Sequence, residues 1–207
     1  MWQALRWVFP ASCEGCGRPA EARLCPACER VAAEAAPGLD GVRWLIALAR
    51  YEGGLATALR RAKYGRDHAL MRAVARTFAD DAAPLAMGFD AVVPVPSTRA
   101  RRVRRGFAPA ALIAQEVGER AGVAVVDALT LRPGVRQAGL SGRARRANLR
   151  GRLVARVGVP GRVLLVDDVC TTGATLSSAA FELLGGATTE VCAVVLCARP
   201  APGAERP

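Results

Sequence analysis

The sequence is poor in several residue types, and each shortage narrows what the chain can do. Of its 29 lysine and arginine residues only Lys63 is a lysine, histidine occurs once, and aromatic residues make up 5%. No apolar run approaches the roughly 18 residues of a membrane span. The first ten residues carry Arg6 inside their apolar part, unlike a signal peptide. These features predict a cytoplasmic protein with no membrane span and few rings for stacking nucleic-acid bases.

Two common nucleotide-binding patterns are also missing. Neither a G-x-x-x-x-G-K-[ST] loop nor a G-x-G-x-x-G loop occurs, which disfavours sites for nucleoside triphosphates and dinucleotides. What remains is 52% hydrophobic and carries a net charge of +11. This composition is typical of a folded basic protein that attracts polyanions.

Residues 163–176 combine a buried-strand pattern with polar residues that suit a ligand. Residues 163–166 are aliphatic without alternation, as expected for a central parallel strand covered on both faces. Asp167 and Asp168 follow at the strand's carboxyl end, where open α/β sheets bind ligands. A loop then offers hydroxyls, a conformationally free glycine and the N–H groups of a helix start, which suit a phosphate: Thr171, Thr172, Gly173, Ala174 and Thr175.

This stretch resembles the 5-phosphoribosyl-1-pyrophosphate (PRPP) signature of type I phosphoribosyltransferases. An ordinary strand, turn and threonine-capped helix is the alternative. Because carboxylates repel a phosphate, the two aspartates are better suited to accept hydrogen bonds from sugar hydroxyls.

Four of the seven cysteines form two C-x-x-C pairs separated by eight residues: Cys13, Cys16, Cys25 and Cys28. This spacing predicts a four-cysteine zinc site, and the lack of a histidine or carboxylate ligand indicates a structural metal. Disulfides are disfavoured in a reducing cytoplasm, and a thioredoxin-type pair is disfavoured because no βαβ pattern surrounds it. The other three are expected to pack, although a helix start could lower the pKa of the first: Cys170, Cys192 and Cys197.

The rest of the chain alternates strand and helix patterns. Strands are expected over residues 43–51, 89–96, 123–131, 163–166 and 189–198, and helices over 55–65, from 68 to at least 78, over 109–121 and over 173–184. This alternation predicts an α/β fold with a mostly parallel twisted sheet flanked by helices. The expected organisation is a zinc-ribbon module over residues 1–36, an α/β domain over 37–199 and a disordered tail over 200–207.

The order of these motifs resembles the ComF family, phosphoribosyltransferase-like proteins associated with natural competence. The features that match are Phe9-Pro10, the four cysteines, Lys63-Tyr64, residues 93–96 and 105–107, Gln137 with Leu140, Arg145 with Asn148, and the loop after the acid pair. The resemblance implies a type I phosphoribosyltransferase-like fold and a site for PRPP with Mg²⁺.

The resemblance also implies a role for individual residues. Asp167 and Asp168 would hold the ribose hydroxyls, and residues 171–175 the 5′-phosphate. A pyrophosphate loop would consist of Ser97, Thr98 and Arg99, and a flexible loop over the site would carry Gln137, Arg143, Arg145 and Asn148. A PRPP site does not establish turnover, so transfer of phosphoribose to an unidentified acceptor stays open.

A second class of function is compatible with the same residues. Arginines cluster at residues 99–105 and 143–152. Such runs are usually solvated surface, but with the high net charge and the link to competence they suggest a single-stranded DNA-binding adaptor. In that reading the protein works with competence or recombination proteins, and its PRPP site is regulatory.

Overall fold

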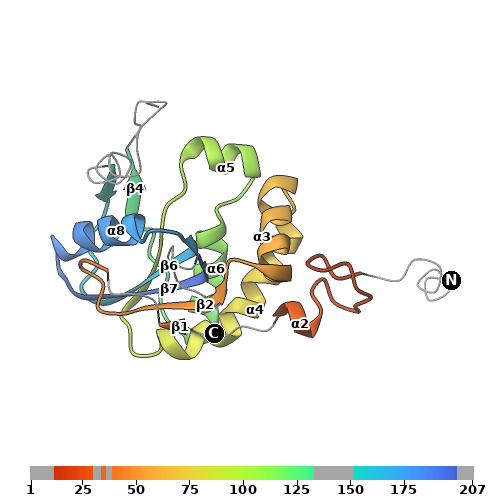
Figure 1. The fold of residues 1–207 in the computed structure, drawn as a ribbon. Coiled ribbons are helices and arrows are strands. Elements are labelled where there is room, and N and C mark those ends of the chain that lie inside the picture. The colour runs from red at the N-terminus through yellow and green to blue at the C-terminus, as the bar shows by residue number, and fades with distance from the viewer. Residues whose placement is uncertain (1–11, 30–33, 36–38, 133–151, 200–207) are drawn as a thin grey trace.

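The computed structural model describes residues 12–29, 34–35, 39–132 and 152–199, and its centre is a five-stranded sheet (Figure 1). The strand order is β1 (Glu34–Ala35), β2 (Leu45–Arg50), β7 (Thr188–Ala198), β6 (Gly161–Cys170) and β3 (Ala91–Pro94). Neighbouring strands from β2 to β3 pair in parallel, and β1 pairs with β2 antiparallel. The predicted mostly parallel sheet is confirmed.

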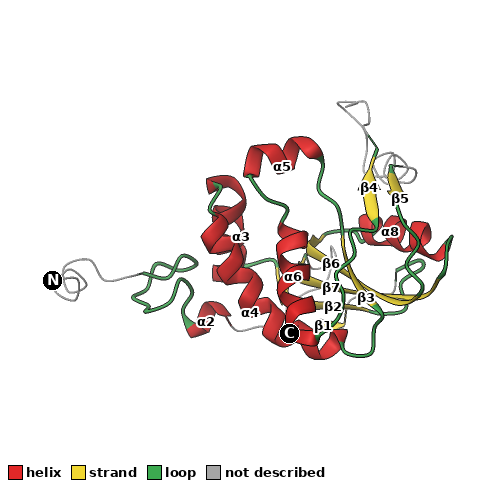
Figure 2. Ribbon diagram, turned by 180° about the vertical axis from the view of Figure 1, so that it is seen from behind, coloured by secondary structure: helices red, strands yellow, loops and turns green. Residues whose placement is uncertain are grey.

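Helices cover both faces of this sheet (Figures 1 and 2). The helices α4 (His68–Ala86) and α6 (Pro109–Ala121) lie on one face, and α8 (Ala174–Leu184) lies on the other. In β6, Leu164 and Val166 belong to the first core and Val163 and Leu165 to the second. Because both faces are buried, this strand is aliphatic without alternation.

Two further helices lie near the edge of the sheet where the parallel strands end. The helix α3 (Gly53–Gly65) follows β2, and α5 (Arg99–Arg105) follows β3. The sequence analysis missed α5 because its seven residues, five of them arginines, have no apolar period and none is buried. Local chemistry defines the helix instead: the Thr98 hydroxyl accepts from the N–H of Arg101 at 3.3 Å, and Gly106 ends it with a φ of 83°.

The strand predicted over residues 123–131 is wrong in its extent, and it does not belong to the main sheet. Only β4 (Leu129–Leu131) is a strand, and it pairs antiparallel with β5 (Leu153–Ala155) in a separate two-stranded sheet. Val125 forms one parallel bridge with Val92 of β3. The N–H of Ala128 then turns back to the carbonyl of Val126, 2.9 Å away, so the chain leaves the main sheet.

The cysteine-bearing segment, residues 12–29 with α2 (Pro26–Glu29), lies beside α3 and α4 (Figure 1). Its backbone touches the start of α3, where a Cβ on Gly15 would lie 2.6 Å from the Gly54 carbonyl oxygen. Arg61 of α3 also pairs with Glu14 at 2.8 Å. We call residues 12–29 the cysteine module. The tail at residues 200–207 lies outside the described residues, and none of the described helices is long and apolar enough to cross a membrane.

Candidate functional site

The candidate site lies at the carboxyl end of β6, between β7 and β3. The strand continues through Asp167 and Asp168 to Cys170. The N–H of Val95 donates to the carbonyl of Val166 at 2.9 Å, so the loop after β3 starts beside the acid pair. Because these strands are parallel, the segments that follow them meet at one edge, where open α/β sheets bind ligands.

The partly buried Asp167 has an unusual affinity for protons. Burial raises its pKa to about 8, helped by the charge of Asp168 and opposed by an N–H donor from Asp168 and by the charge of Lys63. That N–H lies 2.8 Å from Oδ1 of Asp167. Near neutral pH the Asp167 carboxyl can therefore hold a proton and donate a hydrogen bond, which an ionised carboxylate cannot do.

Lys63 reaches the acid pair from α3, and the sequence analysis assigned it no role. Its Nζ lies 2.6 Å from Oδ2 of Asp168, and the two side chains are only 10% and 15% exposed. It shares the buried face of α3 with Leu59 and Ala62. Lysine is rarely buried unless it is paired with an acid. The single lysine of the chain lies on an apolar helix face, and this position in the sequence could have indicated a buried ion pair.

The predicted phosphate loop has the expected geometry. Thr171 and Thr172 are exposed, and Gly173 has a φ of 72°. A Cβ on Gly173 would lie 2.3 Å from the Leu39 side chain, so both conformation and space require glycine. No side chain caps α8 at Gly173, so its first N–H groups are available to an anion. In the adjoining strand, burial raises the pKa of Cys170, which supports a packing role.

The other predicted segments have different outcomes. Ser97 and Thr98 follow β3 and are partly buried, whereas Arg99 is exposed as the first residue of α5. Thr98 serves as the cap of that helix. The predicted flexible-loop residues lie outside the described residues: Gln137, Arg143, Arg145 and Asn148.

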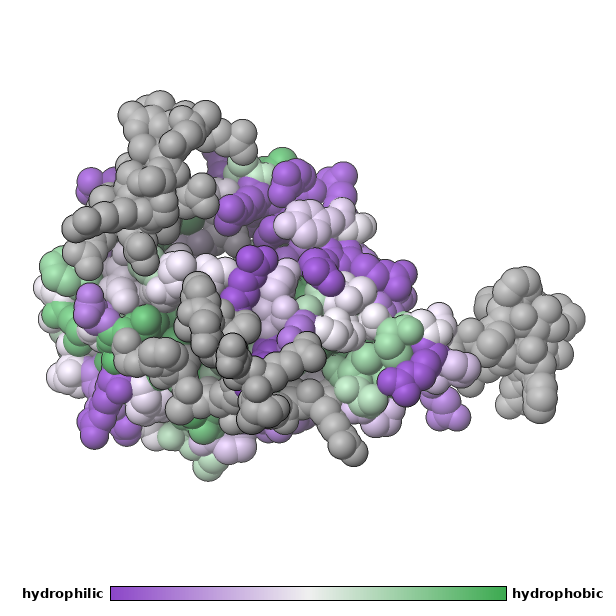
Figure 3. Space-filling view, viewed as in Figure 1, coloured by the Kyte–Doolittle hydropathy of each residue, from purple (hydrophilic) through white to green (hydrophobic). Residues whose placement is uncertain are grey.

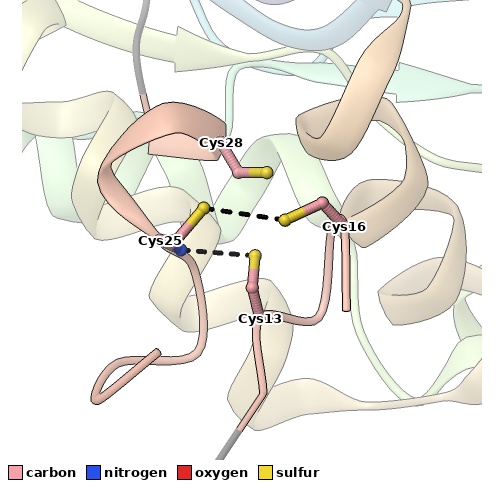
Figure 4. Close-up of side chains that lie close together, drawn as sticks. All are labelled: Cys13, Cys16, Cys25 and Cys28. Carbon is pink, nitrogen blue, oxygen red and sulfur yellow. Dashed lines mark hydrogen bonds between the residues drawn. The ribbon is translucent and has the colours of Figure 1, made fainter. Parts of the chain in front are cut away.

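The four cysteines of the cysteine module come together, and Figure 4 shows the side chains of Cys13 and Cys16 facing those of Cys25 and Cys28, the last of which projects from α2. All four Sγ atoms lie within 4.8 Å of one another, and Cys16 and Cys25 are separated by 3.7 Å between sulfurs. An ion about 2.3 Å from each sulfur in a tetrahedron needs sulfurs about 3.8 Å apart. The cluster could therefore hold zinc.

The surroundings of Cys13 and Cys16 favour thiolates, whereas burial raises the pKa of Cys28. Cys13 Sγ accepts from the N–H groups of Gly15 and Cys25, each at 3.3 Å. The backbone and then the side chain of Arg18 lower the pKa of Cys16 to about 6. Thiolates are the metal-binding form of cysteine. Cys192 and Cys197 are buried in the core, as predicted.

Sequence comparison finds two relatives that match most of the chain. The DNA utilization protein YhgH of Salmonella typhimurium strain LT2 is 32% identical over 201 residues, covering 86% of this chain and 87% of the relative. The protein of the same name from Salmonella typhi is 31% identical over the same length. The chain belongs to the ComF family. No family model matches it. The observed structure has the phosphoribosyltransferase-like α/β fold that is expected of a ComF protein.

Several solved structures resemble this ComF protein. The allosteric regulatory enzyme of purine biosynthesis is 24% identical with a TM-score of 0.43, over 61% of this chain and 26% of that chain. Orotate phosphoribosyltransferase from Aeropyrum pernix is 18% identical with a TM-score of 0.42, over 83% and 77% of the two chains. An adenine phosphoribosyltransferase is 11% identical with a TM-score of 0.42, over 81% and 85%. Strand order and family membership, rather than these low scores, identify the fold.

Proposed function

We propose that this ComF protein binds PRPP with Mg²⁺ at the carboxyl end of β6. One observation carries the proposal: the acid pair, the loop opened by Gly173 and the segment after β3 lie at the same edge of the sheet. The acid pair suits sugar hydroxyls, the loop opened by Gly173 suits a phosphate, and the segment after β3 suits a second anionic group. PRPP has all three.

Different residues of the site bind different parts of PRPP. Asp168, paired with Lys63, accepts hydrogen bonds from the ribose hydroxyls, and Asp167 accepts or donates according to its protonation state. The first N–H groups of α8 and the hydroxyls of Thr171 and Thr172 bind the 5′-phosphate. Ser97 and Arg99 lie on the segment that would meet the pyrophosphate. Mg²⁺, when bound, neutralises pyrophosphate charge and makes it a better leaving group.

This arrangement fits transfer of the phosphoribosyl group to an acceptor. Carboxylates beside the sugar stabilise the positive charge that develops as pyrophosphate leaves. Such a reaction needs little proton transfer by the protein, so the acceptor decides whether turnover occurs. Release of pyrophosphate from PRPP in the presence of candidate bases, followed by phosphorus NMR, tests this step directly.

The binding proposal is tested by calorimetric titration of PRPP with and without Mg²⁺. We expect Mg²⁺-dependent binding that weakens about tenfold or more in the Asp167→Asn/Asp168→Asn variant, because the ribose hydroxyls lose the charged acceptor at Asp168 and the carboxyl of Asp167. Asp81→Asn, which changes one exposed carboxylate on α4, should bind like the wild type. Equal affinity of the double variant and the wild type would contradict the site.

We propose single-stranded DNA binding as a second function, and α5 is the observation that favours it. The helix presents five arginines and buries none of its residues, and hydrophilic side chains gather over α5 and the nearby part of α3 (Figure 3). Arg105 also lies 6.0 Å from the ring centroid of Tyr64, whose side chain is exposed. Cations beside an accessible ring suit a flexible polyanion with bases.

Fluorescence anisotropy with labelled oligonucleotides at several salt concentrations tests this function. We expect Arg101→Ala/Arg102→Ala/Arg104→Ala to weaken binding for all sequences and to reduce the salt slope by about one per lost phosphate contact. A control with the same loss of charge elsewhere, Arg43→Ala/Arg72→Ala/Arg156→Ala, should change binding less. Equal effects of the two triple variants would point to net charge alone and would exclude α5 as the binding surface.

A further inference from the structure

Lys63 is the one compact cation in a chain that otherwise uses arginine. Its ammonium contacts Asp168 at 2.6 Å, and it extends from the buried face of α3. An ammonium concentrates its charge at one point on a narrow stem, whereas a guanidinium is broad and planar. A lysine on a buried helix face can therefore bring one unit of charge to a single carboxylate oxygen, as Lys63 does at Asp168.

The surroundings of the pair are apolar. Cys197 of β7 is fully buried, and its pKa, raised first by burial, also responds in opposite directions to the charges of Lys63 and Asp168. Leu59 and Ala62, on the same face of α3 as Lys63, are fully buried as well. In such surroundings a lone carboxylate or a lone ammonium is costly, and each stabilises the charged form of the other.

Two adjacent carboxylates at a strand end would by themselves attract a hard divalent cation. In this protein the ammonium of Lys63 already supplies a positive charge to the pair before any metal binds. With both aspartates ionised the three side chains carry one net negative charge, and with Asp167 protonated they carry none. Lys63 therefore neutralises most or all of the negative charge of the acid pair without a metal.

We propose that Lys63 is a positioning residue that acts as the resident cation of the acid pair: it orients Asp168 toward the sugar and keeps divalent metal out until PRPP arrives. Mg²⁺ would then depend on the oxygens of the pyrophosphate for most of its ligands, and the acid pair would not have to hold it alone. This inference rests on the proposed function for the identity of the ligand, but its charge argument can be tested without PRPP.

The first test is a titration with Mn²⁺ alone, in which electron paramagnetic resonance measures the concentration of the free ion. We expect weak binding at this site in the wild type and about tenfold or more tighter binding in Lys63→Met, which keeps the length of the side chain and removes its charge. Lys63→Arg keeps the charge and should show no gain. Adding Asp168→Asn to Lys63→Met should abolish the gain, whereas a loss of packing alone would not depend on Asp168.

A second test needs no variant at the site. Because Lys63 is the single lysine, protein grown with [¹³Cε,¹⁵Nζ]lysine gives one side-chain signal. Mn²⁺ alone should leave this signal sharp, and Mn²⁺ with PRPP should broaden it. Broadening by Mn²⁺ alone at concentrations that do not saturate the surface would overturn the inference.

The outcomes separate the two proposals. If the wild type does not bind PRPP but Lys63→Met gains Mn²⁺ affinity, the proposed function fails and the role of Lys63 as resident cation stands. If PRPP binds but neither Lys63→Met nor the lysine signal responds as expected, the role of Lys63 fails and the proposed function stands.

Discussion

The two carboxylates of the site are neighbours in sequence but have different surroundings. Asp168 contacts the ammonium of Lys63, whereas burial and the charge of Asp168 raise the pKa of Asp167 to about 8. A pair arranged in this way can offer an acceptor and a donor to the same sugar. The phosphate loop also requires one particular residue type. Gly173 has a positive φ, and a Cβ there would collide with Leu39.

The raised pKa of Asp167 predicts how stability depends on pH. An unfolded aspartate has a pKa of about 3.9, so between about pH 4 and pH 8 the folded state binds more protons than the unfolded state. The free energy of unfolding should therefore fall as pH rises through this window, by at most about 1.4 kcal/mol per pH unit from this group. Urea unfolding of the wild type and Asp167→Asn from pH 5 to 9 measures the difference.

The Asn variant should lose this part of the slope and gain stability relative to the wild type as pH rises. Asp81→Asn serves as the control, because its carboxylate is exposed and should leave the slope unchanged. Parallel stability curves for the wild type and Asp167→Asn would show that Asp167 ionises normally in the folded protein.

At the scale of secondary structure, α3 joins the two chemically distinct parts of the molecule. Its first turn faces the cysteine module, where a Cβ on Gly54 would lie 2.1 Å from Cys28 Sγ. Its last turn carries Lys63, which contacts Asp168. A helix of 13 residues is about 20 Å long, so one rigid element positions groups at both ends.

The contact at Gly54 predicts an effect on metal binding. Gly54→Ala should displace Cys28 and weaken zinc affinity by about tenfold or more, as changes next to metal ligands commonly do. Competition with a chromophoric chelator measures the affinity. Gly65→Ala at the other end of α3, where a Cβ would have no neighbour within 4 Å, is the matched control. Unchanged zinc affinity in Gly54→Ala would mean that the module shifts to accommodate the methyl group.

Local sequence predicts those helices whose limits have local causes. Residues 109–121 begin at a proline and end before Gly122, and α6 has those bounds. The helix α5 lacks an apolar face, so periodicity could not find it. The segment 123–131 has the residues of a strand, but whether it stays in the sheet depends on a turn at Ala128 and on β5, which comes later in the chain.

At the scale of the whole molecule, the cysteine module packs on the α/β domain: Leu24 and three of its cysteines share a buried cluster with residues of α3 and α4. Charged pairs add to this contact at the surface. Arg23 connects Glu14 of the module to Asp67 at the start of α4, and Arg61 provides a second link to Glu14. These pairs are partly exposed and contribute little to stability by themselves. We expect so small a module to depend on a bound metal for much of its folding energy.

Chelation should therefore loosen the module and leave the domain folded. We expect about one zinc ion per chain by elemental analysis, and after treatment with a strong chelator we expect trypsin to cleave first after Arg23, since Arg18 precedes a proline and resists trypsin. Thermal unfolding of the remaining domain should shift by only a few degrees. Cys192→Ala, which changes a buried cysteine outside the cluster, should retain its zinc. Protection of Arg23 after chelation would contradict a structural metal.

Short-range features of the sequence by themselves determined the parallel sheet, the acid pair at the end of its central strand, the Thr/Gly loop and the four-cysteine cluster. The sheet follows from the alternation of strand and helix patterns along the chain. The other three features depend on spacing within a short segment, where chain geometry leaves few alternatives. Only the tertiary structure decided that Lys63 pairs with Asp168, that α3 links this pair to the cysteine module, and that residues 123–128 leave the sheet. These features depend on how separate elements pack, because burial and charge pairing are set by neighbours in space rather than in sequence.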